Sequence, residues 1–492
     1  MRFINNDWHF LLLIIFFITH GYADFTGLVP PVELFVLLLV LILIAFLFYK
    51  LGKPIFKNAR KAALFVTFFM TVFLFFGAFQ DFLGSFRISS AIAQLKVFFP
   101  LSLLIILLGF FLLKKSSGNF RRLTIFLNVL FVLYILADLA VITVRLISPD
   151  RTKVSNLNAK GLKPEICDSC EKPSVYFIVL DEYSGSDALK AYFNYDNSSF
   201  EQNLAKEGFK VNRGTTSNYV YTVFSMASML NMEYLKGLGK QAAENHFGYR
   251  KATRSISDNV VVNFFKHNGY RINNYSYFQL PDVPPGFKTD YLPGELALIT
   301  HRTMYSRVAK EAVRIAANKL SLTSFQERSE ATFISNNESM LKRALDESAV
   351  QGKEPSFTYL HLMMPHDPIA FDSTGNRIEP FWQRRSFTKK DVDEAYLQYL
   401  VYTNNRIYNF IKSLKENTAG KAIIMLVSDH GYRGSRMNDE TKWRYHSLSA
   451  IYLPRQNYQH WYDGISNVNQ FRALLNSSFG QQLPILKDSL VY

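Results

Sequence analysis

The sequence is poor in cysteine, with two residues among 492, so no disulfide framework holds the fold together. It also contains no long block of lysine and arginine and no zinc-finger spacing. A net charge of +15 is compatible with nucleic-acid binding. Without such a block, however, we expect no nucleic-acid partner. Several long stretches near the start of the chain contain almost no charge, which excludes an ordinary soluble domain over that part.

Five apolar stretches account for the missing charge. A helix needs about 20 residues to cross a hydrocarbon core of about 30 Å. The sequence therefore predicts five transmembrane helices, at Trp8–Ala23, Leu34–Tyr49, Ala62–Phe79, Val97–Leu113 and Leu123–Val144. The first is short and could instead be a signal peptide cleaved after Ala23. We favour a retained helix, because its basic region is Arg2 alone and four further apolar segments follow.

The loops between these segments predict the orientation of the chain. Lys50–Lys61 and Lys114–Arg122 are rich in lysine and arginine, whereas Asp24–Glu33 has neither and Gly84–Lys96 has only two. Basic short loops stay in the cytoplasm. We therefore expect a multi-pass protein of the plasma (inner) membrane, with everything after the fifth helix outside the cytoplasm. The expected domains are residues 1–147 in the membrane, 148–173 as a linker and 174–492 as an outer domain.

The linker contains the only two cysteines, Cys167 and Cys170. A zinc half-site and a redox pair are the functional interpretations, but no second cysteine pair accompanies them. Because the segment is expected outside the cytoplasm, we favour a local structural disulfide.

The outer domain alternates apolar strands with helices. Ser174–Leu180, Phe357–Met364 and Ala422–Val427 are continuous apolar runs, typical of strands buried on both faces. Gly185–Gly208 and Val392–Leu414 have helical spacing. This order predicts an α/β domain with a mainly parallel central sheet. Functional sites in such sheets form beyond the carboxyl ends of the strands.

Each apolar strand ends in residues that bind metals or protons. Asp181 follows the first strand, His366 follows the second, and Asp429 and His430 follow the third. Carboxylate and imidazole ligands favour Zn or Mn over Ca or Mg. Thr222 begins a further predicted helix, where it is either an N-cap or a nucleophile whose hydroxyl is activated by a metal. A single Asp after a strand is commonly only a turn residue, whereas two such strand ends favour a metal site.

These motifs resemble the alkaline phosphatase and sulfatase superfamily. Ser428-Asp429-His430-Gly431 resembles its late metal-binding strand end, and Pro365-His366-Asp367-Pro368 resembles its substrate-contacting histidine loop. Thr222–Leu230 is similar to the sulfatase nucleophile segment, and His446 looks like the last active-site histidine. With the five helices, the chain resembles the membrane-anchored phosphotransferases, including lipoteichoic acid synthase and the phosphoethanolamine transferases.

Three positions depart from the family pattern. Thr222 replaces the sulfatase cysteine that is converted to formylglycine, so sulfate ester hydrolysis by that route is not expected. Met226 replaces the arginine of the same motif, and Asp181 stands where the lipid phosphotransferases usually have glutamate.

The resemblance implies an α/β alkaline-phosphatase-like (sulfatase) domain after five transmembrane helices. It implies a metal held by Asp181, Thr222, Asp429 and His430, with Thr222, His366 and His446 as catalytic residues. The implied reaction moves a phosphorylated head group from a membrane lipid donor to an external glycan or lipid acceptor through a phosphothreonine. Hydrolysis of phosphate, phosphonate or sulfate esters is the enzymatic alternative. A degenerate, non-catalytic sulfatase fold is the third interpretation, although Thr222, Asp429 and His430 are all present.

The charge pattern of the loops gives a first testable prediction. A reporter enzyme that is active only in the cytoplasm, fused after Tyr492, should be inactive, because the basic loops place this end outside. The same reporter inserted in Lys50–Lys61 should be active. Activity of the Tyr492 fusion would contradict the predicted orientation.

Overall fold

The computed structural model describes most of the chain as two compact units. The described residues are 5–26, 29–84, 91–147, 161–167, 170–235, 246–286, 296–309, 324–350, 354–379, 387–434 and 441–491. Unit 1 consists of Met1–Arg151 together with Tyr291–Leu322, and unit 2 of Thr152–Asp290 together with Thr323–Tyr492. Much of the predicted linker, residues 148–160, lies outside the described residues.

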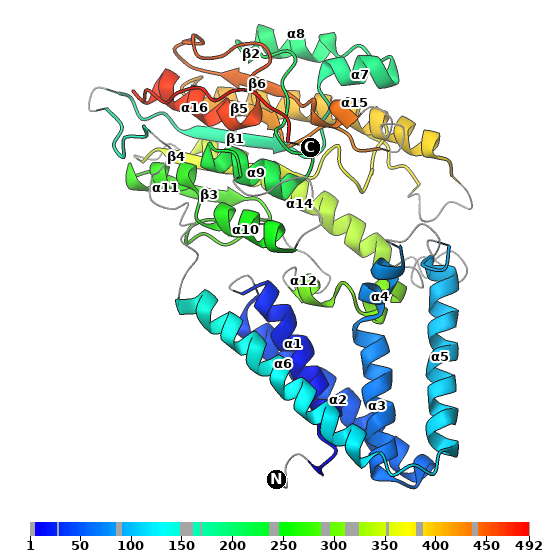
Figure 1. The fold of residues 1–492 in the computed structure, drawn as a ribbon. Coiled ribbons are helices and arrows are strands. Elements are labelled where there is room, and N and C mark those ends of the chain that lie inside the picture. The colour runs from blue at the N-terminus through cyan, green and yellow to red at the C-terminus, as the bar shows by residue number, and fades with distance from the viewer. Residues whose placement is uncertain are drawn as a thin grey trace. The chain divides into compact units, whose positions relative to one another are not determined.

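Unit 1 has helices and no strand among its described residues (Figure 1). Its helices are α1 (His9–Asp24), α2 (Pro31–Phe56), α3 (Ala59–Leu74), α4 (Phe76–Gly84), α5 (Leu95–Lys115), α6 (Arg121–Ile147) and α12 (Leu296–Thr300). All five predicted apolar segments are therefore helical. Three of the helices, α2, α5 and α6, are long and apolar enough to span a membrane, and the pair α3–α4, bent by 55°, adds a fourth span if it is counted as one.

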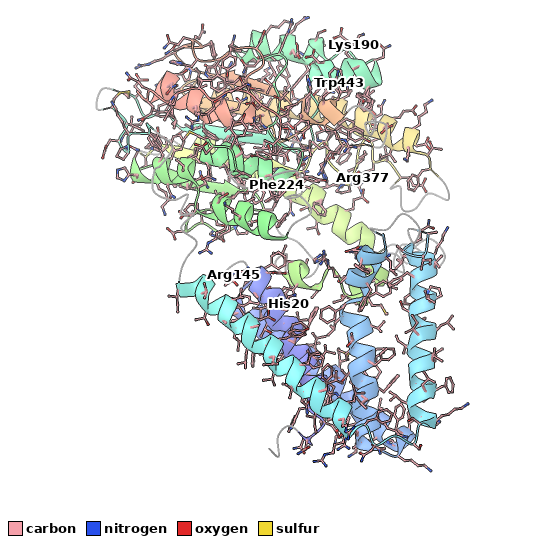
Figure 2. All side chains as sticks on the ribbon, viewed as in Figure 1. His20, Arg145, Lys190, Phe224, Arg377 and Trp443 are labelled. Carbon is pink, nitrogen blue, oxygen red and sulfur yellow. A yellow bond between two sulfur atoms is a disulfide. The ribbon has the colours of Figure 1, made fainter. Side chains whose placement is uncertain are left out.

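The expected count of five spans is not confirmed, because α1 has only 16 residues. This helix is short yet largely covered by protein: it packs against α2, α3 and α6. Within it, His20, labelled in Figure 2, places Nδ1 3.2 Å from Oδ1 of Asp138 on α6. Protein contacts of this kind replace some of the lipid contacts that a lone apolar helix would need.

The break between α3 and α4 has a local cause. The backbone N–H of Gly77 donates to the carbonyl of Arg302, in the segment that follows α12. A Cβ at Gly77 would lie 2.8 Å from the Arg302 Cα, so only glycine permits this approach. Gly21 on α1 is likewise covered by Ile299 of α12. The sequence analysis did not predict that residues 291–322 belong to the membrane unit.

Unit 2 is built on one six-stranded sheet (Figure 1). Its strand order is β2-β6-β5-β1-β4-β3. The strands are β1 (Val175–Leu180), β2 (Lys210–Val211), β3 (Arg271–Tyr275), β4 (Ser356–Leu362), β5 (Ile423–Ser428) and β6 (Ser449–Tyr452). β3, β4, β1 and β5 are parallel, whereas β6 is antiparallel to both β5 and β2. The sheet is thus mixed, and the expectation of a mainly parallel sheet holds only for its four-stranded centre.

Helices cover both faces of this sheet. Alternate residues of β1 point to opposite faces: Phe177 packs with α9, α10, α11 and α16, and Ile178 with α7, α8, α14 and α15. The bounds are α7 (Ser186–Phe193), α8 (Ser198–Lys206), α9 (Thr222–Asn231), α10 (His246–Ser257), α11 (Val260–His267), α14 (Ser324–Ala349), α15 (Lys389–Asn417) and α16 (Asn467–Ser478), with a 3-10 turn η3 (Thr441–Tyr445).

The strand predictions for β1, β4 and β5 are confirmed. The helical stretch expected at 185–208 is two helices, because Asn194 adopts a left-handed φ of 49°.

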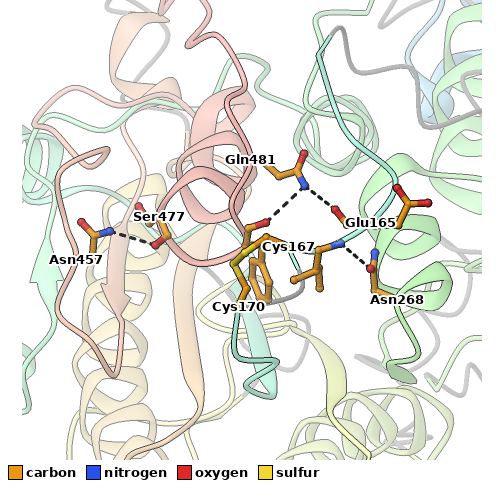
Figure 3. The surroundings of a disulfide bond; sticks show 9 residues. Glu165, Cys167, Cys170, Asn268, Asn457, Ser477 and Gln481 are labelled. Carbon is orange, nitrogen blue, oxygen red and sulfur yellow. Dashed lines mark hydrogen bonds between the residues drawn. A yellow bond between two sulfur atoms is a disulfide. The ribbon is translucent and has the colours of Figure 1, made fainter.

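Cys167 and Cys170 form the expected local disulfide (Figure 3). The chain around it is held by side-chain amides: Asn268 accepts from the N–H of Ile166 at 2.8 Å, and Gln481 donates to the carbonyl of Glu165 at 3.1 Å. Gly480 lies against the disulfide with φ +67°, and a Cβ there would be 2.9 Å from the sulfur of Cys167. Hydrogen bonds to Asn268 and Gln481 therefore fasten the segment that carries the disulfide to the rest of unit 2.

Candidate metal and phosphoryl-transfer site

The candidate site lies where the central parallel strands end. Leu180 pairs in register with Leu362 of β4 and with Ser428 of β5. The next residues after β1 and β5, Asp181 and Asp429, therefore leave the sheet at the same edge. Both are completely buried. The sequence prediction that strand ends converge is confirmed for these two carboxylates.

A histidine within β4 completes a group of possible metal ligands. Ligand atoms of Asp181, His361 and Asp429 all lie within 4.8 Å of one another. Nε2 of His361 is 3.2 Å from Oδ2 of Asp181. The sequence analysis did not include His361 among the site residues, because a histidine inside an apolar strand is as often a core residue. The available signal was its place one residue before the end of β4, in register with Val179 of β1.

Some oxygens of the two aspartates accept hydrogen bonds from the protein, and others have no such partner among the described residues and are called open below. Oδ1 of Asp429 accepts from the backbone N–H groups of Glu182, at 3.1 Å, and His430, at 2.9 Å. Oδ2 of Asp429 and Oδ1 of Asp181 have no hydrogen-bond partner among the described residues, although both are buried. Burying charged oxygens without partners is costly. Two open carboxylate oxygens beside an imidazole fit a divalent cation.

The charge of Asp181 is stabilised by its neighbours. Burial opposes ionisation of this carboxyl, but the nearby imidazoles of His366, His361 and His430 outweigh it, so its pKa lies below the ordinary value. Asp181 is therefore a carboxylate at neutral pH, which is the form that binds a cation.

His430 has a defined tautomer. Its Nδ1 lies 2.9 Å from the carbonyl of Gly431, and because a carbonyl only accepts, Nδ1 carries the proton. Nε2 then holds a lone pair, 3.3 Å from Oδ2 of Asp429 and 3.2 Å from Oγ1 of Thr222. The imidazole thus presents a ligand atom to the space between Thr222 and the carboxylates.

Thr222 contacts this site instead of capping its helix. The N-cap of α9 is Tyr221, which makes no side-chain capping bond, and Thr222 is the first helical residue. The N-cap interpretation of Thr222 is therefore wrong, since its hydroxyl bonds to His430. One turn further on, Ser225 donates to the carbonyl of Asp429 at 2.5 Å, and this bond fastens α9 to the end of β5. The amino terminus of the helix, which favours anions, lies beside the carboxylate edge.

A buried tyrosine orients His361. The Tyr359 hydroxyl lies 2.7 Å from Nδ1 of His361, on the side of the ring opposite Asp181. Tyr277 and Phe278 pack against the same ring, with centroids at 4.9 and 5.9 Å. A ligand histidine is commonly held in this way through its other nitrogen.

Charged groups of both signs line a cavity of about 350 Å³ next to Asp181. Its lining includes the basic residues His366, Lys389 and Arg433 and the acidic residues Glu182, Asp367 and Asp393. Glu182 has a left-handed φ of 63° and accepts from the N–H of Arg433 at 2.8 Å. Nη2 of Arg433 and Oε2 of Glu182 lie 3.3 and 3.7 Å from Nε2 of His366. The strained backbone at Glu182 is of the kind that concentrates at functional sites.

The carboxylates around His366 favour the charged form of its imidazole in the metal-free protein. Burial alone would lower its pKa, but the carboxylates of Asp181 and Glu182 outweigh this effect and raise it to about 9. Together with the guanidinium of Arg433, whose pKa is raised despite burial by Glu182 and the site aspartates, it provides positive charge beside the carboxylate group.

His446 lies apart from these residues. It lines a different cavity with Gly185 and Asp187, and its ring centroid is 4.8 Å from that of Trp443. Among the described residues, no hydrogen bond or ion pair joins it to Thr222 or the buried carboxylates. Burial lowers its pKa. The structure thus brings together Asp181, Thr222, Asp429 and His430, places His366 nearby and separates His446; the catalytic and metal roles of all six stay predictions.

Comparison with known proteins agrees with the resemblance seen in the motifs. The family model described as Sulfatase matches residues 173–472. Among curated proteins, none matches the chain by sequence.

Solved structures that match the chain include three enzymes. One is the integral membrane protein lipooligosaccharide phosphoethanolamine transferase A (EptA) from Neisseria meningitidis. The match has 12% sequence identity and a TM-score of 0.42, and it covers 98% of this chain and 96% of that protein's chain. The C-terminal periplasmic domain of EptC from Escherichia coli, in complex with Zn, is 12% identical over 67% of this chain and 90% of its own, with a TM-score of 0.39. The phosphonate monoester hydrolase SpPMH from Silicibacter pomeroyi is 16% identical. The match covers 65% of this chain and 75% of that protein's chain, with a TM-score of 0.39.

The open carboxylate oxygens predict where a metal binds. Asp429→Asn in the full chain should reduce the bound divalent metal to near zero, because it removes a buried negative charge while keeping an oxygen that accepts the N–H groups of Glu182 and His430. Elemental analysis of the detergent-solubilised protein measures the content. Asp463→Asn, at an exposed position, is the matched control. An unchanged metal content in Asp429→Asn would refute the assignment.

The raised pKa of His366 predicts a pH-dependent stability. In chelator-treated protein, the stabilising charge of His366 is fully present below its unfolded pKa of about 6.5 and is lost as the pH rises through about 9. The thermal midpoint should therefore fall between these values, and His366→Gln should reduce that fall. His267→Gln, with a half-exposed side chain, should leave it unchanged. Identical pH profiles for wild type and His366→Gln would contradict the inferred charge.

Proposed function

The chain belongs to the sulfatase family, and on that premise we propose that it transfers a phosphorylated head group from a membrane lipid to an external glycan or lipid. It is an enzyme of the transferase or hydrolase kind. The proposed nucleophile is Thr222, and the proposed intermediate is a phosphothreonine. The apolar helices of unit 1 supply the reason for a lipid donor, because they keep the enzyme in the same bilayer as that donor.

One observation carries the proposal. The hydroxyl of Thr222 lies at the start of α9, 3.2 Å from Nε2 of His430 and thus beside the open carboxylate oxygens. A threonine that served only to begin a helix would turn its hydroxyl to the helix backbone. This placement supports a reactive hydroxyl at a metal site. The sulfatase cysteine is absent at this position, so the route through formylglycine is not part of the proposal.

The proposed metal ligands are Asp181, Asp429, His430 and Thr222, with His361 as a further donor. A divalent cation held there, Zn or Mn by the chemistry of its ligands, would lower the pKa of the Thr222 hydroxyl and offset phosphoryl charge. The described oxygens and nitrogens fit this role because they are buried, close together and open.

Thr222, His366 and Arg433 have different roles in the proposed reaction. Thr222 loses its proton to solvent and attacks phosphorus, so that an O–P bond forms while the bond from phosphorus to the lipid oxygen breaks. His366, as the imidazolium, gives its proton to the departing lipid oxygen. An acceptor hydroxyl next gives its proton to His366 and attacks phosphorus, while the bond from phosphorus to the Thr222 oxygen breaks. The released Thr222 oxygen takes a proton from solvent, which replaces the one lost in the first step. Arg433 holds the phosphoryl oxygens beside His366 through its guanidinium.

Hydrolysis shares the first half of this reaction and differs only in the second, where water replaces the acceptor hydroxyl. The family description, Sulfatase, is the observation that favours it. The two functions are separated by the product: a modified glycan or lipid for transfer, and a free phosphorylated head group for hydrolysis.

Replacement of Thr222 tests the nucleophile. Thr222→Ala should lower turnover of a phospholipid or phosphodiester by roughly 10³-fold or more, the scale expected when a covalent nucleophile is removed. It should cost well under about 1 kcal/mol of stability, because the hydroxyl does not cap α9. Thr222→Ser should keep part of the activity. Intact-mass analysis of the wild-type chain with membrane lipids should show an adduct on Thr222.

The control uses another hydroxyl of the same helix. Ser228, six residues along α9, donates to the carbonyl of Glu233 at 2.9 Å, and Ser228→Ala should retain turnover. Thr222→Cys should give no sulfatase activity, since Phe224 and Met226 still break the surrounding sulfatase pattern. Wild-type turnover by Thr222→Ala with its metal still bound would place the nucleophile elsewhere.

A further inference from the structure

The turn after β1 presents Glu182 from a strained backbone. Its φ of 63° is a left-handed value that costs free energy in a residue with a Cβ. The Glu182 carboxylate nevertheless has a fixed place, because Oε1 accepts from the backbone N–H of Arg433 at 2.8 Å and lies 3.4 Å from Nε of the same residue. A strained conformation persists only where surrounding contacts hold it. The contacts that hold this turn therefore also decide where the guanidinium of Arg433 lies.

One side chain of α15 bonds to this turn at two backbone groups. The hydroxyl of Tyr396 donates to the carbonyl of Glu182 at 2.8 Å and accepts from the N–H of Ser184 at 3.2 Å. All three residues are buried, so these backbone groups depend on protein partners instead of water. A hydroxyl can donate and accept at the same time, which lets Tyr396 satisfy both groups of the strained turn.

The ring of Tyr396 connects this turn to the turn after β5. It stacks on the ring of Tyr432, with the centroids 3.9 Å apart and the planes inclined by 22°. Tyr432 directly precedes Arg433 in the chain. The Tyr432 hydroxyl donates to Oδ1 of Asp393 on α15 at 2.8 Å, and its N–H donates to the hydroxyl of Ser184 at 2.9 Å. One turn of α15 therefore contacts both of the turns that carry the site.

Tyr396 itself lies behind the wall of the reaction space. Glu182, Tyr432 and Arg433 line the cavity of about 350 Å³ beside Asp181, whereas Tyr396 is not part of its lining. Its side chain is 1% exposed. Tyr396 thus contacts the residues that form the wall and not the space within it, so any effect on a bound phosphoryl group passes through those residues.

The other contacts of the Arg433 guanidinium restrain it less. It lies over the ring of Tyr221, 5.7 Å from the centroid, and Nη2 lies 3.3 Å from Nε2 of His366. The Tyr221 side chain is 46% exposed, and an exposed ring offers a surface without a directed bond. The nearly buried Glu182 carboxylate is therefore the contact that fixes Arg433, and Tyr396 holds the turn from which that carboxylate extends.

We propose that Tyr396 is a positioning residue for phosphoryl binding: it holds the strained turn at Glu182, and through the Glu182 carboxylate it keeps Arg433 where it binds phosphoryl oxygens. The inference rests on the proposed function, in which Arg433 has that role, and adds to it a residue that touches no substrate. Loss of the hydroxyl alone leaves the ring stack with Tyr432 intact. It frees the backbone of the turn to relax, and Arg433 then loses its fixed carboxylate.

Phosphate binding by the full chain tests this role. Inorganic phosphate is titrated into detergent-solubilised protein supplied with one equivalent of Zn²⁺, and binding is followed by calorimetry. Tyr396→Phe should raise the dissociation constant for phosphate at least fivefold. Its metal content should equal that of the wild type, because the hydroxyl bonds only to backbone groups of the turn. The matched control is Tyr399→Phe, which removes a hydroxyl from the same helix at the same exposure of 1% and should bind phosphate as the wild type does.

A double variant shows whether the effect passes through Arg433. In a chain that already carries Arg433→Ala, Tyr396→Phe should change phosphate affinity less than twofold. An equal loss with and without Arg433 would overturn the proposal, as would wild-type affinity in Tyr396→Phe or no phosphate binding by the wild type. Thermal midpoints report folding. If Tyr396→Phe folds poorly, Ser184→Ala, which removes the hydroxyl that accepts from the Tyr432 N–H, should still weaken phosphate binding, and unchanged affinity there would contradict the role of the turn.

A parallel measurement separates this proposal from the proposed function. Wild-type protein is incubated with membrane lipids and examined for the Thr222 adduct by intact mass. Phosphate binding that depends on Tyr396, without any adduct, would refute the phosphothreonine reaction and leave the positioning role standing. An adduct on Thr222, together with wild-type phosphate affinity in Tyr396→Phe, would refute the positioning role alone.

Discussion

The site depends on two buried carboxylates that leave neighbouring parallel strands at the same edge. Asp181 and Asp429 occupy corresponding positions just after β1 and β5, so their side chains lie close together. Two like charges in a buried place repel, and each carboxylate has an oxygen without a hydrogen-bond partner among the described residues. The surrounding imidazoles and backbone N–H groups reduce this cost without removing it. A divalent cation is what remains to complete the balance, and the tautomer of His430 and the position of Thr222 are both consistent with that requirement.

Much of this edge could be predicted from the sequence, because its signals are local. About ten consecutive residues are enough to recognise each strand end. One is a buried apolar run followed by Asp181, and the other is a buried apolar run followed by Asp429 and His430. β3 gave no such signal: Arg271–Tyr275 contains Arg and two Asn, since it is the edge strand and only one neighbour covers it. The long capped helix α15 was predicted to within a turn at each end, because its apolar spacing is regular.

Residues whose role depends on distant neighbours were harder to predict. His361 reads as a core residue, and only the pairing of β4 with β1 brings it to Asp181. His446 reads as an active-site residue by its motif, yet the antiparallel direction of β6 and the turn before it place it beside a different cavity. In the membrane unit, the expected count of five spans is not confirmed, because α1 has only 16 residues and hydropathy does not reveal that other helices cover it. The return of Arg302 to Gly77 has no local sequence signal at all.

The charges around the site bear on how transfer competes with hydrolysis. The carboxylate group is buried and anionic, whereas the cavity beside it carries groups of both signs, including the guanidinium of Arg433 and the ammonium of Lys389. These two cations suit a phosphodiester, whereas a neutral hydroxyl gains little from them. Water is always present at high concentration, so an acceptor succeeds only if its hydroxyl is held near the phosphothreonine for longer than a water molecule stays.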